Sequence, residues 1–376
     1  MESGTPAAGP SQAASEFRSV TVVVPTYREV ESIPHLIRRL AVLREQSGLD
    51  LDLLLMDDDS KDGSVELVES LGLPWANMVV RHHDRGLSQA VLDGLRSANR
   101  PCVVVMDADL SHPPEKIPEM LLALEHGADL VVGSRFTPGG STADDWGVVR
   151  WLNSRVATLL AMPLAKLKDP MSGFFAMRRA TFLSGHDLNP VGYKIGLELL
   201  IKCDCKKVIE VPIHFSDRRH GKSKLTLREQ LKYLQHLRRL YIHKYGNWSH
   251  LAQFLVVGAS GLVVNLVLLT AFLAIRLDGK LAIGFAIALS MCWNFVLNRR
   301  FSFSYARQGN VLRQFVGFIA ASSIGAVVNY MTTLALWEAF QVKQLAAVVG
   351  VVAGTALNFL GSRFIVFRRE HIRPDR

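Results

Sequence analysis

The chain has little cysteine, with four in 376 residues. Cys102, Cys203, Cys205 and Cys292 are scattered, and Cys203-x-Cys205 lacks the second pair and the spacing of a zinc site. We therefore expect reduced, buried thiols in a protein that faces the cytosol. A secretory signal peptide is also missing, because residues 1–16 are rich in Pro, Ala, Gly and Ser and contain no apolar stretch. We expect a disordered leader over residues 1–17.

The chain has fewer acidic than basic residues, with 34 Asp and Glu and 43 Lys and Arg. A basic balance favours an anionic partner, which could be nucleic acid, a phospholipid surface or a phosphorylated substrate. The long apolar runs in the last third of the chain favour the membrane, so we expect no nucleic acid partner.

Charge is absent from these apolar runs. None of the four contains Asp, Glu, Lys, Arg or His, and each is about as long as the ~20 residues that cross the hydrocarbon core of a bilayer. We expect four transmembrane helices, at about 251–275, 281–298, 314–337 and 344–362. The alternative is a soluble bundle of four buried helices, but such helices normally carry a polar face.

The same region contains a repeat with a spacing of 64 residues. The recurring pairs include Gly261 and Gly325, Asn265 and Asn329, Asn294 and Asn358, and Phe303 and Phe367. A repeat of this kind indicates a duplicated helical hairpin and supports the count of four helices. It also predicts that residues 251–367 form one membrane domain.

Basic residues are unevenly distributed around the four helices. Arginines gather between the second and third helix and after the fourth, at positions 299, 300, 307, 313, 363, 368 and 369. By the positive-inside rule we expect the central loop and both termini in the cytoplasm, with a basic tail at 368–376. The sequence thus predicts a multi-pass protein of the cell membrane whose preceding domain is cytoplasmic.

Residues 214–250, before the first membrane helix, are basic and carry leucines at helical spacing, among them Leu227, Leu231, Leu234 and Leu237. A basic amphipathic helix directly before a transmembrane helix favours the membrane surface. We therefore expect amphipathic interface helices here. A helix that packs on the preceding domain is the alternative.

Short β-rich runs alternate with amphipathic stretches between residues 18 and 213. The runs are continuously apolar, as strands covered on both faces should be, and lie at 20–24, 51–56, 78–80, 102–106, 130–132 and 208–211. This alternation predicts an α/β domain with a mostly parallel sheet and helices on both faces. Ligands of such sheets bind at the carboxyl ends of the strands.

Acidic residues follow two of the predicted strands. Asp57, Asp58 and Asp59 follow the second, and three adjacent carboxylates can be buried only with hydrogen bonds or a cation. Ribose hydroxyls would suit one of them. Asp107 and Asp109 close the fourth strand, and alternate strand residues point the same way. Both could therefore reach a divalent ion and the diphosphate that it carries.

Six motifs occur in this order: Pro25-Thr26-Tyr27-x-Glu29, Asp57-Asp58-Asp59-Ser60, Met106-Asp107-Ala108-Asp109-Leu110-Ser111-His112-Pro113, Gly133-Ser134-Arg135, Asp169-Pro170-Met171-Ser172-Gly173-Phe174, and Glu210-Val211-Pro212-Ile213 through Arg218-x-x-Gly221-x-Ser223-Lys224. Together they resemble the dolichyl-phosphate mannosyltransferases, inverting enzymes of the GT-A fold. The resemblance covers nearly all of residues 20–245. Residues 189–198 resemble the archaeal-type members, and the membrane part resembles the GtrA-like four-helix domain.

The resemblance implies a donor site for GDP-mannose. The guanosine would be held by Pro25, Tyr27, Glu29, Met56 and Asp58. The diphosphate and its Mg²⁺ or Mn²⁺ would be held by Asp107, Ala108 and Asp109. Ser111 occupies the position of a metal-binding glutamine in archaeal relatives, so the implied metal ligands are Asp107, Asp109 and Ser111.

The resemblance also implies cations for both phosphates. Arg135, Arg218 and Lys224 would bind the donor, and Arg135, Arg150 and Ser154 would bind the lipid phosphate. The residues implied in catalysis are Asp109, Arg135 and Arg218. An Asp before a Pro usually starts a turn, so we expect a structural role for Asp169.

The implied reaction transfers mannose from GDP-mannose to dolichyl or polyprenyl phosphate, with inversion. One alternative is a polyprenyl-phosphate glucosyltransferase that uses UDP-glucose. A processive polysaccharide synthase is disfavoured, because the Q-x-x-R-W motif of that group has Gly147 in place of glutamine. In another class, the membrane half could translocate glycolipids beside a vestigial transferase, but the acidic pair and the cations argue against an inactive enzyme.

Overall fold

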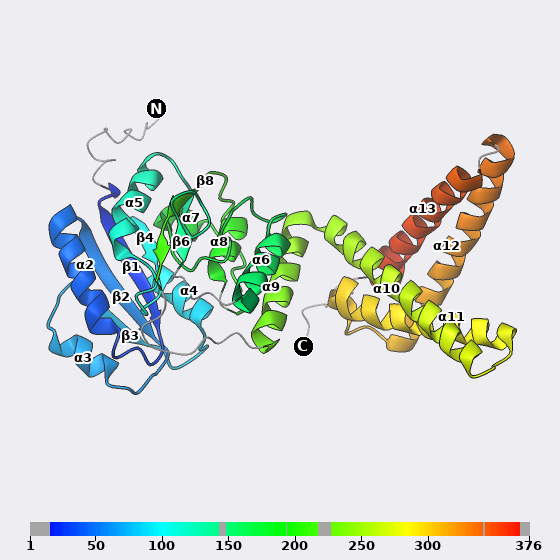
Figure 1. Ribbon diagram of the computed structural model, residues 1–376, viewed down its shortest axis with the longest axis horizontal. Helices are drawn as coiled ribbons and strands as arrows, with labels where there is room; N and C mark the ends of the chain where they lie inside the picture. The colour runs from blue at the N-terminus through cyan, green and yellow to red at the C-terminus, as the bar shows by residue number, and fades with distance from the viewer. Residues whose placement is uncertain (1–15, 143–147, 193, 217–226, 341–342, 369–376) are drawn as a thin grey trace, which may run out of the picture. The chain divides into compact units, whose positions relative to one another are not determined.

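The structure is a computed structural model that describes residues 16–142, 148–192, 194–216, 227–340 and 343–368. The chain divides into two compact units, Met1–Lys244 and Tyr245–Arg376 (Figure 1). The first unit contains a mixed α/β sheet, and the second contains long helices.

A seven-stranded sheet organises the first unit, in the order β3-β2-β1-β4-β7-β5-β8. The strands are β1 (Ser19–Thr26), β2 (Asp50–Asp57), β3 (Ala76–Val80), β4 (Cys102–Val105), β5 (Leu130–Ser134), β7 (Phe175–Arg178) and β8 (Val208–Pro212). All pair in parallel except β7, which runs antiparallel between β4 and β5. The mostly parallel sheet is confirmed, but the sequence did not predict β7. Strands β6 (Ser141–Thr142) and β9 (His214–Phe215) form a separate pair.

Helices cover both faces of the sheet (Figure 1). They are α2 (Ile33–Ser47), α3 (Ser64–Ser70), α4 (Leu87–Ser97), α5 (Ile117–Glu125) after a 3₁₀ turn (Pro114–Lys116), α6 (Val148–Ala161), α7 (Arg179–Leu183), α8 (Ile195–Lys202) and α9 (Leu227–Tyr245). Successive strand residues point to opposite faces. Val22 and Val24 therefore join the core under α2 and α5, while Val23 joins the core under α4 and α8.

Helix α9 packs along α6 within the first unit. The hydroxyl of Tyr233 donates to the carbonyl of Ala157 at 2.7 Å, and that of Tyr241 donates to the carbonyl of Leu160 at 2.8 Å. Leu237 is buried in this contact. One side of α9 therefore packs on the α/β domain, as the alternative interpretation of this basic segment predicts. Leu231 and Leu234 on α9 are exposed and could contact a membrane surface.

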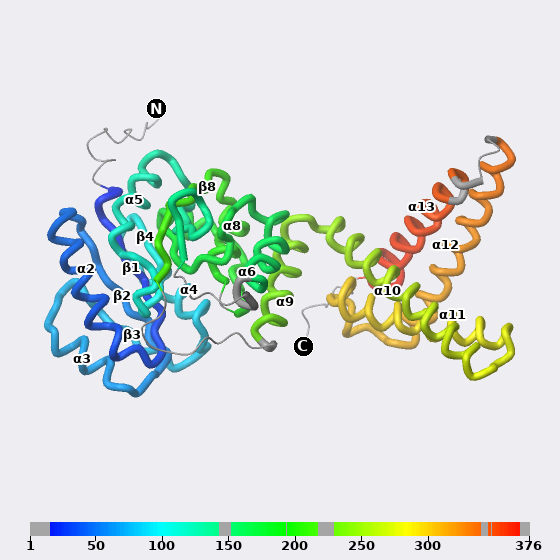
Figure 2. Tube along the Cα trace, in the orientation of Figure 1, coloured from blue at the N-terminus to red at the C-terminus, as the bar shows by residue number. Residues whose placement is uncertain are grey.

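The second unit contains the four predicted apolar helices. They are α10 (Asn247–Ala274), α11 (Gly279–Leu297), α12 (Val311–Phe340) and α13 (Lys343–Gly361), and each overlaps a segment long and apolar enough to cross a membrane. Helix α10 packs on α11 and helix α12 packs on α13, so that the unit consists of two hairpins (Figure 2).

The 64-residue repeat reappears in the structure of the hairpins. Helices α11 and α13 both continue into a π-helical turn, Asn298–Ser302 and Ser362–Val366. Three pairs of phenylalanines at the repeat spacing share one core, namely Phe254 with Phe318, Phe295 with Phe359, and Phe303 with Phe367. The rings of Phe303 and Phe367 are fully buried and stack with centroids 4.9 Å apart. The duplicated halves therefore meet through equivalent aromatic residues.

The second hairpin depends on a close approach between glycines. A Cβ atom added at Gly354 would lie 2.4 Å from the carbonyl oxygen of Gly325. Since the carbonyl oxygen belongs to the backbone of α12 and cannot turn aside, Gly354→Ala is expected to destabilise the hairpin by about 1–3 kcal/mol. Thermal unfolding of the detergent-solubilised protein measures this loss. Gly284→Ala in α11 is the matched control, because a Cβ there meets no atom within 4 Å. Equal effects of the two substitutions would contradict the packing argument.

Candidate active site

Three neighbouring strands end at one edge of the sheet. Strands β2, β1 and β4 are parallel and adjacent, so the residues that follow them come together in space. Tyr27 follows β1, Asp58 follows β2, and Asp107 and Asp109 follow β4. Sheets of this kind bind ligands at this edge.

The backbone at this edge is strained. Arg28, Asp59, Lys61 and Leu110 have φ angles of 60°, 57°, 52° and 63°. A non-glycine residue in this region costs on the order of 1–3 kcal/mol and persists only where its surroundings impose it. Leu110 lies directly between Asp109 and Ser111, so the turn after β4 is held in an uncommon conformation.

The backbone of Asp107 is held by His112. The Asp107 N–H donates to Nδ1 of His112 at 3.0 Å, and the buried imidazole stacks on Phe174 with centroids 5.3 Å apart. Burial lowers the pKa of His112, although the nearby Asp107 acts in the opposite direction. The neutral ring keeps Nδ1 as an acceptor. A Cβ added at Gly173 would lie 3.6 Å from Oδ1 of Asp107, so the segment before β7 borders this carboxylate.

Asp109 is oriented by Ser111. Oδ1 of Asp109 accepts from the Ser111 N–H at 3.1 Å and from the Ser111 hydroxyl at 2.5 Å. Both side chains are buried. The hydroxyl that was predicted to bind the metal thus contacts the neighbouring carboxylate, and its coordination of a metal stays a prediction.

The carboxylates of Asp107 and Asp109 suit a hard divalent cation. Among the described residues, no three His, Cys, Asp or Glu side chains gather into a cluster that could hold a metal. Mg²⁺ and Mn²⁺ commonly bind through one or two carboxylates together with water and substrate phosphates. The donor set therefore fits an ion that arrives with a phosphorylated substrate.

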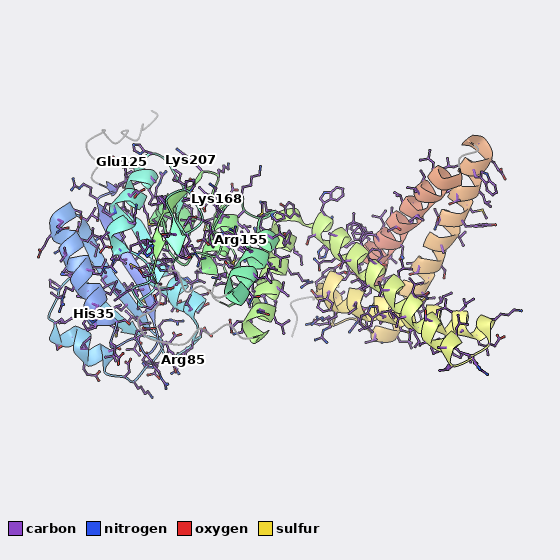
Figure 3. All side chains as sticks on the ribbon, viewed as in Figure 1. His35, Arg85, Glu125, Arg155, Lys168 and Lys207 are labelled. Atoms are coloured by element: carbon purple, nitrogen blue, oxygen red, sulfur yellow. The ribbon has the colours of Figure 1, made fainter. Side chains whose placement is uncertain are left out.

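The three consecutive aspartates at the end of β2 have separate partners. Asp57 accepts from the Ser60 N–H at 2.8 Å. Asp58 accepts from the guanidinium of Arg81, and Asp59 accepts from Arg85, which is labelled in Figure 3. Each carboxylate therefore has its own donor, which relieves the repulsion between neighbours.

A pocket of about 390 Å³ opens beside β1 and β2, lined by residues 28–32 and 60–62. Glu29 lies in its wall, and the exposed ring of Tyr27 has the guanidinium of Arg28 above it, 5.3 Å from the centroid. Among the other predicted donor residues, the side chains of Met56 and Ala108 are buried in the core. Any contact that they make with a donor would use main-chain atoms.

Arg135, which directly follows β5, forms a two-point ion pair with Asp169. Nε and Nη2 of Arg135 donate to the two carboxylate oxygens at 2.7 and 2.8 Å. Asp169 is 0% exposed and the Arg135 side chain is 11% exposed. The Asp169 N–H in turn donates to Glu210 at 3.0 Å. Asp169 therefore orients the arginine, a contact that the predicted turn before Pro170 did not indicate.

Comparisons with known proteins show the family to which this chain belongs. Residues 21–183 match Glycosyl transferase family 2, and residues 253–367 match the GtrA/DPMS transmembrane domain. Dolichol-phosphate mannosyltransferase of Pyrococcus furiosus is 35% identical over 353 residues, which are 93% of this chain and 99% of that protein. This chain belongs to the dolichol-phosphate mannosyltransferase family. It is a glycosyltransferase with a membrane domain, and the GT-A fold is confirmed.

Fungal members of the family are also similar. The dolichol-phosphate mannosyltransferases of Mycosarcoma maydis and Saccharomyces cerevisiae are 40% and 39% identical, over 62% and 60% of this chain and 82% and 88% of their own lengths. Among solved structures, glucosyl-3-phosphoglycerate synthase of Mycobacterium tuberculosis is 21% identical with a TM-score of 0.46, covering 64% of this chain and 86% of that one.

For several of the predicted site residues, the structure describes only the backbone or does not describe the residue. Arg150 belongs to helix α6, but its side chain is not among those described. Ser154 lies on the same helix and is half-buried, while Arg218 and Lys224 fall outside the described residues. Their roles remain predictions.

The structure adds residues whose roles the sequence did not reveal. Arg81 contacts Asp58, His112 supports Asp107, and Glu210 supports Asp169. His112 and Glu210 belong to two of the six motifs, but the sequence does not indicate which residues they contact. For Arg81 the only signal was its place directly after a predicted strand.

Proposed function

We propose that the protein transfers mannose from GDP-mannose to dolichyl or polyprenyl phosphate. Attack at C1 would invert the anomeric centre and yield dolichyl β-D-mannosyl phosphate and GDP. The observation that carries this proposal is the pair Asp107 and Asp109 at the exit of β4, beside the Asp58 region, in a chain similar over 93% of its length to the Pyrococcus furiosus enzyme.

The chain's own residues would hold the donor from two sides. Asp58 and the pocket beside Glu29 would bind the nucleoside, and Asp107 and Asp109 would bind the diphosphate; the shared edge of β2, β1 and β4 supports this assignment. Mg²⁺ or Mn²⁺ held by Asp107 and Asp109 would neutralise the diphosphate and stabilise it as a leaving group. Lys224 and Arg218 are proposed to add positive charge to the same phosphates.

The acceptor needs no strong general base. A phosphate monoester has a second pKa of about 6, so its oxygen is already anionic at neutral pH. His112 is not placed to act as a base, because Nδ1 accepts the Asp107 N–H and the ring is buried. The new bond would form between a phosphate oxygen and C1 of mannose while the bond from C1 to the diphosphate breaks. Catalysis then consists of positioning and charge neutralisation.

Arg135 would neutralise charge between the two phosphates. Asp169 fixes the plane of its guanidinium, and a planar fork suits phosphate oxygens. Arg150 and Ser154 on α6 would bind the phosphate of the lipid. This assignment gives Arg135 a role toward both substrates.

An apolar surface on the first unit supports the proposal that this unit contacts the bilayer. Large side chains on α6 and α9 are exposed, with Val156 48%, Leu159 66%, Leu231 58% and Leu234 49% accessible. Exposed apolar side chains gathered on two packed helices are typical of a surface that meets lipid or protein. We propose that this surface lies on the cytoplasmic leaflet, with both termini and the catalytic unit in the cytoplasm.

An assay of the detergent-solubilised full chain tests the proposed function. With polyprenyl phosphate and Mg²⁺ or Mn²⁺, GDP-mannose is expected to yield a mannosylated lipid phosphate, and UDP-glucose is expected to yield no product. A chelator such as EDTA should lower turnover to background, and added Mg²⁺ or Mn²⁺ should restore it. Product from UDP-glucose alone would contradict the donor, and turnover that survives chelation would contradict the metal.

A further inference from the structure

Arg81 is a buried arginine outside every site that the sequence predicted. It follows β3 directly, and its side chain is 5% exposed. Its guanidinium donates to Oδ1 of Asp58, to Oδ2 of Asp93 on helix α4 at 2.9 Å through Nε, and to the carbonyl of Asp84 at 2.9 Å through Nη2. One side chain thus joins the ends of β2 and β3 to the loop before α4 and to the middle of α4.

The other oxygen of Asp58 is held as well. Oδ2 of Asp58 accepts from the Gly86 N–H at 2.7 Å. Gly86 precedes helix α4 with a φ of 140°, which favours glycine, so this N–H can point back at the strand end. Asp58 is therefore held at Oδ1 by a side chain and at Oδ2 by the backbone, which restricts rotation of the carboxylate.

This arrangement is poorly explained by stability alone. A buried ion pair contributes little more than a well-packed apolar pair of the same volume, because both charges lose their hydration. Buried pairs are better suited to holding a group in one orientation. The carboxylate held here belongs to Asp58, which the proposed function assigns to the nucleoside of the donor.

We propose that Arg81 is a positioning residue for the donor nucleotide. It sets the orientation of Asp58, which accepts hydrogen bonds from the nucleoside, and it does not touch the donor itself. A carboxylate that turns away loses directional hydrogen bonds to N–H and O–H groups. This inference rests on the donor site of the proposed function.

The test compares three variants of the full chain in detergent. Arg81→Met removes the charge and keeps a long apolar side chain. Asp93→Asn weakens the support behind Arg81 from a partly exposed position. Arg96→Ala is the matched control, because Arg96 is 53% exposed and contacts the other oxygen of Asp93 at 3.1 Å. Binding of GDP and of UDP is measured by calorimetry, and KM is measured for donor and for acceptor.

The expected results separate positioning from stability. Arg81→Met should raise the Kd for the preferred nucleotide by about tenfold to a hundredfold, the effect of one lost charged hydrogen bond. Donor KM should rise in parallel, while acceptor KM stays at the wild-type value. Asp93→Asn should act in the same direction with a smaller effect, and Arg96→Ala should change neither constant. If the role of Arg81 is purely structural, Arg81→Met should lower the melting temperature and should not raise donor KM relative to acceptor KM.

Each other outcome contradicts a defined part of the inference. Wild-type nucleotide binding by folded Arg81→Met would overturn it, and if that variant does not fold, unchanged binding by Asp93→Asn would overturn it. If the wild type binds UDP and not GDP, the proposed donor is wrong, but the ratio of UDP affinities between the variants and wild type still tests Arg81. A wild type that binds neither nucleotide contradicts both proposals.

Discussion

Asp109→Asn is expected to lower kcat by about 10³-fold or more while the protein stays folded. The Ser111 N–H and hydroxyl both donate to Oδ1 of Asp109, and an asparagine Oδ1 can accept the same two bonds. The shape of the turn after β4 is therefore preserved. The substitution removes a negative charge where a divalent cation and a diphosphate are proposed to bind, and electrostatic stabilisation of the leaving group is lost with it.

The measurement is single-turnover and steady-state transfer at increasing Mg²⁺ or Mn²⁺, with a melting curve for each protein. Asp204→Asn is the matched control, because it removes the same charge from a side chain that is 88% exposed and lies outside the site. The Asp109 variant should melt near wild type, and the Asp204 variant should keep wild-type turnover. Wild-type kcat in Asp109→Asn with an unchanged metal dependence would refute the metal assignment.

Arg135→Lys is expected to lower kcat by about 10²-fold. Lysine keeps the positive charge but has no planar fork, so it cannot bind both oxygens of Asp169 and remain aligned for a phosphate. Asp169→Asn should lower kcat by a similar factor, because an asparagine cannot accept from both Nε and Nη2 of Arg135 and hold its guanidinium in place. It should also destabilise the protein by about 3–5 kcal/mol, since it leaves a largely buried arginine without its counter-charge.

Another arginine fork provides the control for this pair. Nε and Nη2 of Arg39 donate to Glu115 at 2.9 and 2.5 Å at a partly exposed position outside the site. Arg39→Lys should leave kcat unchanged, so a loss in Arg135→Lys can be assigned to the site rather than to the chemistry of the substitution. Wild-type kcat in Arg135→Lys would show that the fork is not required for transfer.

The strands that carry the site could be predicted because each is a continuous apolar run buried on both faces. The runs at 51–56 and 102–106 became β2 and β4, and the acidic residues at their ends lie at one edge of the sheet because both strands run parallel to β1, which lies between them. Strand β7 (Phe175–Arg178) was not predicted from the sequence. Its antiparallel insertion between β4 and β5 is nevertheless what brings Gly173 beside Asp107.

The chain by itself determined the two-part organisation, the four membrane helices, their duplication and the acidic residues at the strand ends. These features are local, because hydropathy, charge and repeat spacing can be counted along a single segment. Tertiary structure alone decided which side chains pair: Arg81 with Asp58, Arg135 with Asp169, and Phe303 with Phe367. Each pair joins residues far apart in the sequence, and their contact depends on how the strands and hairpins pack.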